Sequence, residues 1–215
     1  MRGARTAAAI VMVAAGLIDC AAQSPPQPAQ TMTFFVTSTG RGFGADLGGL
    51  AGADARCQQL ASAAGAGGHM WRAYLSAAAA SGQPVVNARD RIGKGPWFNF
   101  RGEMIADSVA TLHRDDNGIT RDTALTEKGT TIAPGRHDIL TGSNVDGTLS
   151  KDAGDTTCRN WTSHDTGQAM LGHVNRYGGG VRPTSWNSAH LSRGCSQSDL
   201  RASLGDALLY CFAAD

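Results

Sequence analysis

Apolar residues along the chain come in short runs separated by glycines and polar turns, and only a few runs have a clear period. The run 34–37 (FFVT) is rich in β-forming side chains and predicts an opening strand. In the segment 53–64, alanine, cysteine and leucine residues recur at helical spacing, and Gly65 follows directly. This pattern predicts a helix over 53–64 with Cys57 on its inward face.

Three further segments show a pattern. The segment 71–76 (WRAYLS) alternates large apolar with polar or small residues and predicts a second strand, the segment 84–92 predicts a short second helix, and the run 207–212 (ALLYCF) predicts a final strand. Most of the chain between the segments 84–92 and 207–212 is broken by turns that contain glycine and proline. Two early helices followed by short, mostly antiparallel strands and long loops indicate an α+β domain rather than a parallel α/β sheet.

The segment 1–22 is typical of a signal peptide. Arg2 and Arg5 form a positive n-region, and residues 7–18 form an apolar region that is too short to span a membrane. The alternative, a buried N-terminal helix, is disfavoured because the segment has no polar face. The folded domain is therefore expected outside the cytoplasm.

Cys20 follows Leu17, Ile18 and Asp19 in an arrangement that resembles the lipobox of bacterial lipoproteins, whose cysteine is acylated. Asp19 departs from that pattern, which has a small residue before the cysteine. Lipidation of Cys20 is the preferred prediction, and ordinary cleavage after Ala22 is the alternative. Membrane contact is expected only through such a lipid anchor.

The segment 23–32 is rich in proline and glutamine and predicts an extended tether between the signal peptide and the domain. No internal repeat, heptad pattern or second linker follows it. The remaining residues, 33–215, are therefore predicted to form one domain.

Composition restricts the function further. Nineteen Lys and Arg residues against 18 Asp and Glu give a formal net charge of +1, which argues against electrostatic capture of nucleic acid. The 215 residues include 28 glycines and 7 prolines, and only 6% are aromatic. Such a composition favours a turn-rich fold with a lean core, for which the cysteines become important.

Four cysteines remain when Cys20 is set aside, at positions 57, 158, 195 and 211. An even number of cysteines in an exported chain predicts two disulfides, with three pairings open. A zinc site is the competing interpretation, but the gaps are far wider than in a Cys-x-x-Cys pair.

Six short stretches follow one another in a characteristic order: 71–76 (WRAYLS), 84–87 (PVVN), 139–147 (ILTGSNVDG), 157–162 (TCRNWT), 167–169 (GQA) and 208–211 (LLYC). This ordered series resembles endostatin, the C-terminal domain of type XV and XVIII collagens, and more generally C-type lectin-like domains. With its signal peptide and tether, the whole chain resembles bacterial endostatin-like exported proteins, some of them surface lipoproteins.

The resemblance implies a C-type lectin-like (endostatin-like) fold with two nested disulfides. In that pairing, Cys57 joins Cys211 and connects the first helix to the last strand, and Cys158 joins Cys195 inside it. The resemblance also implies, for some members, contact with matrix components.

Metal sites of the related folds are not supported by the sequence. Calcium-dependent lectins need a carboxylate after Trp-Asn, and here Ser188 follows Trp186 and Asn187, so Trp186 is interpreted as packing. Endostatin holds zinc with N-terminal histidines, and the matching region 33–36 has none. The six histidines form no pair at helical spacing, so no cofactor is predicted.

No enzyme motif is found either, including the Gly-x-Ser-x-Gly elbow and the phosphate-binding loop. Surface chemistry remains, because arginine suits carboxylate and sulfate groups. Trp161 also has a packing interpretation beside Cys158. The candidate ligand face comprises Arg159, Trp161, Arg176, Arg182 and Arg193.

We therefore expect a non-enzymatic binding module of the cell envelope, at the outer surface or in the periplasm, that recognises an extracellular protein or glycan through its loops. A structural or wall-associated envelope protein without a soluble ligand is the first alternative. A calcium-dependent lectin or a carbohydrate hydrolase is the second.

Overall fold

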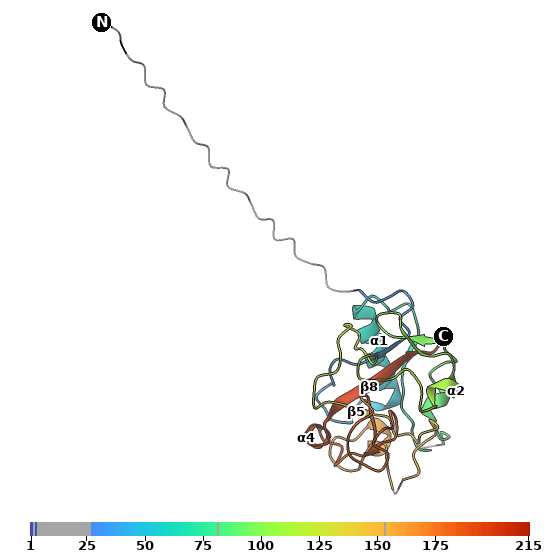
Figure 1. The fold of residues 1–215 in the computed structure, drawn as a ribbon. Coiled ribbons are helices and arrows are strands. Elements are labelled where there is room, and N and C mark those ends of the chain that lie inside the picture. Colours follow the sequence, from blue (N-terminus) through green and yellow to red (C-terminus); the bar gives the residue numbers. More distant parts are fainter. Residues whose placement is uncertain (2, 4–26, 81, 153) are drawn as a thin grey trace.

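The computed structural model describes residues 1, 3, 27–80, 82–152 and 154–215. This part of the chain is an α+β structure with few helices and short strands, as the sequence predicts (Figure 1). Cys20 and nearly all of the predicted signal peptide lie outside the described residues. In the described part of the chain, no helix combines the length and apolar character needed to cross a membrane.

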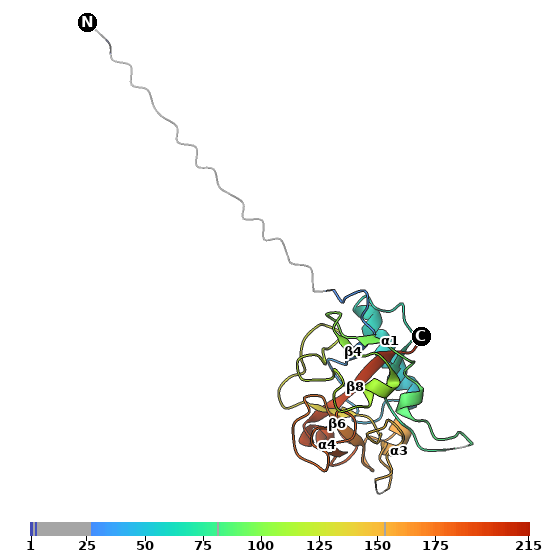
Figure 2. The same ribbon diagram turned by 45° about the vertical axis from the view of Figure 1, so that its right-hand side comes forward.

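The longest strand, β8 (Gly205–Ala213), organises the main sheet. It pairs antiparallel with β1 (Phe34–Val36) and β2 (Trp71–Ala73) and parallel with β5 (Asp138–Leu140). Figure 2 shows β8 crossing the body from α4 towards the C-terminus.

Beyond β5 the sheet continues with β6 (Met170–His173), which pairs antiparallel with β5, and ends with β7 (His190–Leu191). Two further strands, β3 (Trp97–Phe98) and β4 (Met104–Ala106), form a separate antiparallel pair.

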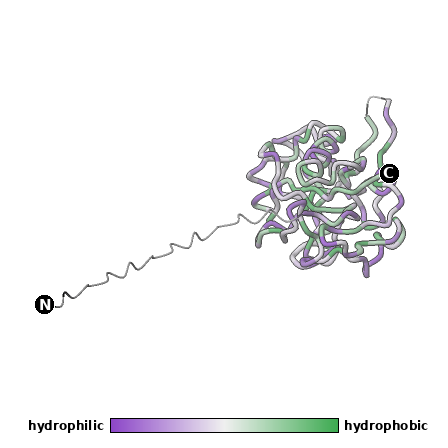
Figure 3. Tube along the Cα trace, turned by 90° about the horizontal axis from the view of Figure 1, so that it is seen from above, coloured by the Kyte–Doolittle hydropathy of each residue, from purple (hydrophilic) through white to green (hydrophobic). Residues whose placement is uncertain are grey.

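Strand β8 is buried on both faces, which explains its nearly continuous apolar sequence. Leu209 and Cys211 pack in the hydrophobic cluster that contains Cys57 of the first helix. Tyr210 and Phe212 point the other way, into a cluster with Trp97 and other residues. Figure 3 shows hydrophobic segments through the middle of the body and hydrophilic segments mainly at its periphery.

The main helix, α1 (Gly49–Ala63), begins before the predicted segment 53–64 and packs against β2. The predicted second helix over 84–92 is wrong in extent, because only the 3₁₀ turn η1 (Ala88–Asp90) is helical. Val86 is extended and bridges to Ala77, so a helix cannot begin at the start of that segment.

The remaining helices are short: α2 (Val109–Leu112), α3 (Cys158–Trp161) and α4 (Gln197–Ala202). All four residues of α3 have positive φ, between 47° and 67°, so this turn is left-handed. Such a backbone is unfavourable for L-residues and is held here by tertiary contacts of its two ends.

Two disulfides are present, Cys57–Cys211 and Cys158–Cys195, in the nested pairing that the endostatin resemblance implies. The first connects α1 to β8. The second connects α3 to the segment before α4. Such bridges are typical of proteins that fold in a non-reducing, extracytoplasmic environment.

The packed domain begins before the predicted boundary at residue 33. The backbone N–H of Ala29 donates to the carbonyl of Phe100, and Met32 is buried in the core beside α1. The last residues of the predicted tether 23–32 are therefore part of the domain.

Candidate functional site

A large cleft of about 880 Å³ lies between the turn after α2 and the loop that connects β6 to β7. It contains two arginines of the predicted ligand face, Arg176 and Arg182. The other lining residues are His113, Arg114, Asp115, Asp116, Val145, Val181, Pro183, Thr184, Ser185, Trp186 and Asn187.

Arg176 is a half-buried cation on one side of this cleft. Its Nε donates to the carbonyl of Ile119 at 2.7 Å, and its Nη2 donates to Oδ1 of Asn117 at 2.6 Å. These acceptors are neutral, and no ion pair of Arg176 occurs among the described residues. Burial lowers the pKa of Arg176, although an arginine keeps its charge at physiological pH. The cleft therefore holds a positioned positive charge that is not hydrogen-bonded to a carboxylate of the described chain, with Asp115 and Asp116 of the same cleft acting on it only at longer range.

Arg182 is held more firmly. Its Nε donates to the carbonyl of Ser188 at 2.6 Å, and its Nη2 contacts a carboxylate oxygen of Asp152 at 3.0 Å. Because Asp152 already balances its charge, Arg182 shapes the wall of the cleft more than it attracts an anion.

The floor of the cleft is aromatic and hydrogen-bonded. Trp186 is 3% exposed, so the packing interpretation of this residue is confirmed. Nε2 of His113 accepts from the hydroxyl of Tyr74 at 2.8 Å, and the amide of Asn187 donates to the same hydroxyl at 2.9 Å. Burial lowers the pKa of His113, so its ring is neutral. Oδ1 of Asn187, the atom that would coordinate a calcium ion, accepts from the hydroxyl of Ser185 at 3.1 Å, so both ends of this amide are used internally.

The other residues of the predicted ligand face do not join the cleft. Trp161 is fully buried, and its Nε1 donates to the carbonyl of Ser76 at 2.8 Å, so its assignment to an exposed face is wrong and its packing role is correct. Arg159 lines a separate cavity of about 170 Å³. Arg193 is exposed in the turn after β7, where its backbone N–H donates to the hydroxyl of Ser203.

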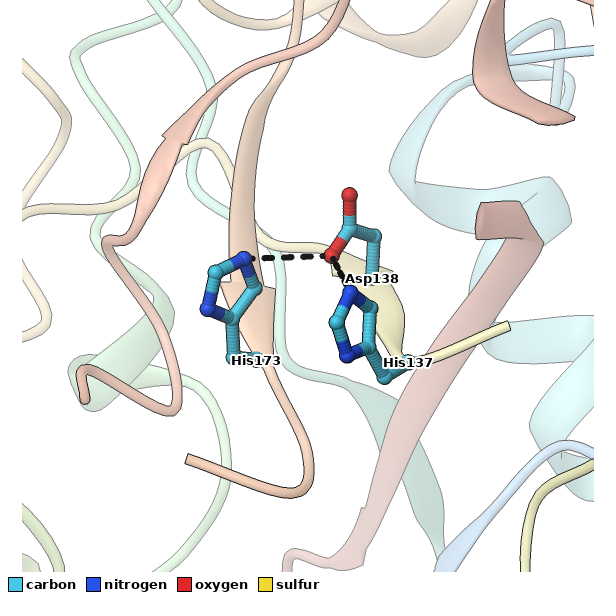
Figure 4. A group of neighbouring side chains, drawn as sticks. All are labelled: His137, Asp138 and His173. Atoms are coloured by element: carbon cyan, nitrogen blue, oxygen red, sulfur yellow. Dashed lines mark ion pairs between the residues drawn. The ribbon is translucent and has the colours of Figure 1, made fainter. Parts of the chain in front are cut away.

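A second group of functional side chains lies under the loop that connects β6 to β7. Asp138 is the first residue of β5, and it pairs in register with His173, the last residue of β6. His137 precedes Asp138, and His190 begins β7. Figure 4 shows the rings of His137 and His173 directed at the Asp138 carboxylate from two sides. We call these four residues the His–Asp cluster.

The distances within the His–Asp cluster are short. Nε2 of His137 and Nε2 of His173 each lie 3.3 Å from Oδ1 of Asp138, and Nε2 of His190 lies 3.3 Å from Oδ2. The ligand atoms of His137, Asp138 and His173 all lie within 4.8 Å of one another. Imidazole nitrogens and a carboxylate are typical ligands of divalent transition metals, so this cluster is the group of residues that could hold a metal.

The hydrogen bonds of the rings fix which nitrogen faces the carboxylate. Nδ1 of His173 donates to the carbonyl of Pro183 at 2.7 Å, and Nδ1 of His190 donates to the carbonyl of Leu191 at 2.9 Å. Burial lowers the pKa of His173, which favours its neutral ring, whereas the contact with Asp138 raises the pKa of His190.

Sequence analysis missed this cluster because it searched for histidines at fixed spacing along the chain. The four residues come from three strands, and only the order β5-β6-β7 brings them together. The only local sign is the pair His137-Asp138 before an apolar run.

The chain was compared with known proteins, and no protein-family model and no curated protein matches it.

Proposed function

We propose that this protein is a non-enzymatic, extracytoplasmic binding module that recognises a protein or glycan ligand carrying an acidic group. The observation that carries this proposal is the unpaired Arg176 in the large cleft. A guanidinium held in place by neutral acceptors, here the carbonyls of Ile119 and Thr184 and the amide oxygen of Asn117, presents its remaining N–H groups to a carboxylate or sulfate without first breaking an ion pair.

Exposed apolar side chains beside this charge support a binding role. Val181 is 81% exposed and Val145 is 49% exposed, and both line the cleft. A cation next to accessible apolar surface suits a ligand that has both an acidic group and an apolar face, such as an acidic sugar or a peptide segment.

The proposal includes the fold family and the location. The nested disulfides and the connection from α1 to β8 support an endostatin-like, C-type lectin-like domain. The lipobox-like sequence around Cys20 and the segment 23–32 support attachment to the cell envelope, where such a domain could contact matrix components.

An array of glycans and matrix proteins tests the function, with the full exported chain as the probe, in calcium and in chelator. We expect binding to acidic ligands that does not need calcium and that weakens as salt is added. Arg176→Gln should reduce affinity about tenfold to a hundredfold, the range expected for one charge-assisted hydrogen bond.

Two further variants make this test specific. Val181→Glu adds a negative charge at an exposed position of the cleft and should weaken binding without affecting folding. Arg101→Gln removes an exposed arginine elsewhere and should change nothing. Binding that is lost in Arg159→Gln or Arg193→Gln but kept in Arg176→Gln would contradict the assignment of the binding site to the cleft. An array without any signal would favour a structural envelope protein.

A further inference from the structure

The Asp138 carboxylate lies in a chemical environment that a protein does not normally maintain without a positive charge. Asp138 and His173 have side chains with no exposed surface, and both Asp138 oxygens and Nε2 of His173 have no hydrogen-bond partner among the residues that the structure describes. A buried carboxylate without hydrogen bonds is costly.

The tautomers increase this cost. Because Nδ1 of His173 donates to the carbonyl of Pro183, the neutral His173 ring directs its Nε2 lone pair at Oδ1 of Asp138. A lone pair facing a carboxylate oxygen at this distance is repulsive unless a cation lies between them. Hydrogen bonds from the far ring nitrogen to backbone carbonyls are also the usual way in which proteins orient histidine ligands of metals.

The spacing fits a small tetrahedral ion. With metal–ligand distances of about 2.0–2.1 Å, neighbouring ligand atoms of a tetrahedral zinc site are about 3.3–3.4 Å apart. In the His–Asp cluster, Nε2 of His137 and Nε2 of His173 each lie 3.3 Å from the same oxygen, Oδ1 of Asp138, which matches this spacing. Nε2 of His190 lies 3.3 Å from the other oxygen, Oδ2.

The loop over the cluster is built to approach the rings closely. Gly178 has a φ of +154°, and a Cβ at this position would lie 2.6 Å from Cε1 of His173. Gly180 has a φ of +102°, and a Cβ there would lie 2.8 Å from Cβ of His190. Gly178 and Gly180 therefore approach the two rings in a way that only glycine permits.

We propose that the His–Asp cluster binds one zinc ion through His137, Asp138 and His173, and that His190, which lies beside Oδ2 rather than Oδ1 of Asp138, supplies the fourth ligand. Three imidazoles and one carboxylate form a donor set that suits zinc and disfavours calcium, which prefers oxygen ligands. The site differs from the N-terminal histidine site of the endostatin resemblance, since its residues lie on β5, β6 and β7. Zinc here would join the three strands and hold the loop 174–189, whose residue Pro183 also lines the large cleft.

Titration of the chelator-treated, full exported chain with Zn²⁺ by calorimetry tests the site. We expect one zinc ion per chain and a rise in Tm of about 5 °C or more when free zinc is a hundredfold above its Kd. Replacement of zinc by Co²⁺ should give the visible absorption of tetrahedral cobalt. Hydrogen exchange should slow in 174–189 when zinc binds.

Asp138→Asn keeps the size of the side chain and should abolish the stoichiometric binding and the Tm shift. His190→Asn changes a ring that is partly accessible, so the protein should fold, and its zinc affinity should fall by a factor of about 100 or more. His164→Asn is the matched control, because this histidine is exposed and lies outside the cluster.

Two outcomes would overturn the proposal. Absence of stoichiometric zinc binding in the wild type would mean that the cluster is only an ion pair between Asp138 and a protonated histidine. Zinc binding that survives in Asp138→Asn and is lost in His164→Asn would place the metal elsewhere. The test of Arg176 compares the wild type with Arg176→Gln under the same conditions, so failure of the zinc proposal leaves that comparison unchanged. Because a chelator would also remove zinc from the loop 174–189, which contains Arg176, the calcium-free arm of that test is repeated with added Zn²⁺.

Discussion

Two buried aspartates, Asp54 in α1 and Asp138 in β5, have opposite surroundings. Asp54 of α1 accepts hydrogen bonds from Arg72 and Arg91, each at 2.7 Å, and from the backbone N–H of Ala73 at 2.9 Å. Asp138 has no hydrogen-bond donor in the described chain and faces three imidazole rings. The first carboxylate is neutralised by the protein itself, whereas the second has the surroundings of a ligand to an added cation.

The two regions also differ in how their strands are joined. The Asp54 region, formed by α1, β2 and the end of β8, is connected covalently by Cys57–Cys211. The region of β5, β6 and β7 contains the His–Asp cluster. Among the described residues, it has no counterpart of the disulfide and the two arginines that stabilise the Asp54 region. Burial alone therefore does not distinguish a carboxylate in a structural ion pair from a carboxylate that binds a metal. The two are distinguished by whether the protein supplies hydrogen-bond donors to the carboxylate oxygens.

The largest expected effect on the free energy of unfolding comes from removing the Cys57–Cys211 disulfide of the Asp54 region. The double variant Cys57→Ser, Cys211→Ser should lower the free energy of unfolding by about 5 kcal/mol, because the bridge closes a loop with a sequence separation of 154 residues. Urea unfolding under oxidising conditions measures this. Removing Cys158 and Cys195 should cost less, about 4 kcal/mol, because their separation is 37 residues. A larger loss of unfolding free energy on removal of Cys158–Cys195 than on removal of Cys57–Cys211 would contradict this dependence on loop length.

Asp54→Asn should have the next largest effect. It removes the partner of Arg91, whose side chain is 13% exposed, and leaves a mostly buried guanidinium without a carboxylate. We expect a loss of about 3 kcal/mol in urea unfolding, the same with and without zinc. The control Asp116→Asn breaks an exposed pair with Arg114 and should cost less than about 0.5 kcal/mol. Equal effects in the two variants would show that the Asp54 pairs contribute no more than a surface contact.

The smallest effect has the opposite sign. In chelator, Asp138→Asn should increase the free energy of unfolding by about 1 kcal/mol, because it removes a buried charge without hydrogen bonds and the introduced amide can donate to Nε2 of His173. Urea unfolding in chelator and in zinc measures the change. In zinc the variant should instead be the less stable protein, since only the wild type gains the binding energy. Destabilisation in chelator would mean that Asp138 is already neutralised in the absence of metal.

Local patterns predicted the elements that are buried in a regular way. The nearly continuous apolar run of β8, which is buried on both faces, and the helical spacing around Cys57, which reflects one face packed against a core, were both identified from the sequence. The short strands β5, β6 and β7 were not identified, because two to four residues give no measurable period. The prediction that Trp161 lies on an exposed face was wrong because its side chain is buried by residues that are distant in sequence, such as Ser76, whose carbonyl accepts from Nε1 of Trp161.

The sequence by itself determined the class of this protein: a disulfide-containing α+β domain, with a predicted export signal, a nearly neutral charge and long glycine-rich loops. Those properties depend on composition and on neighbours in the chain. Only the tertiary structure decided which charges are paired, because a carboxylate is neutralised by groups within a few ångströms, whatever their separation in sequence. Asp54 and Asp138 are the same residue type in apolar surroundings, and the order of the strands, not the local sequence, gives one of them arginines and the other histidines.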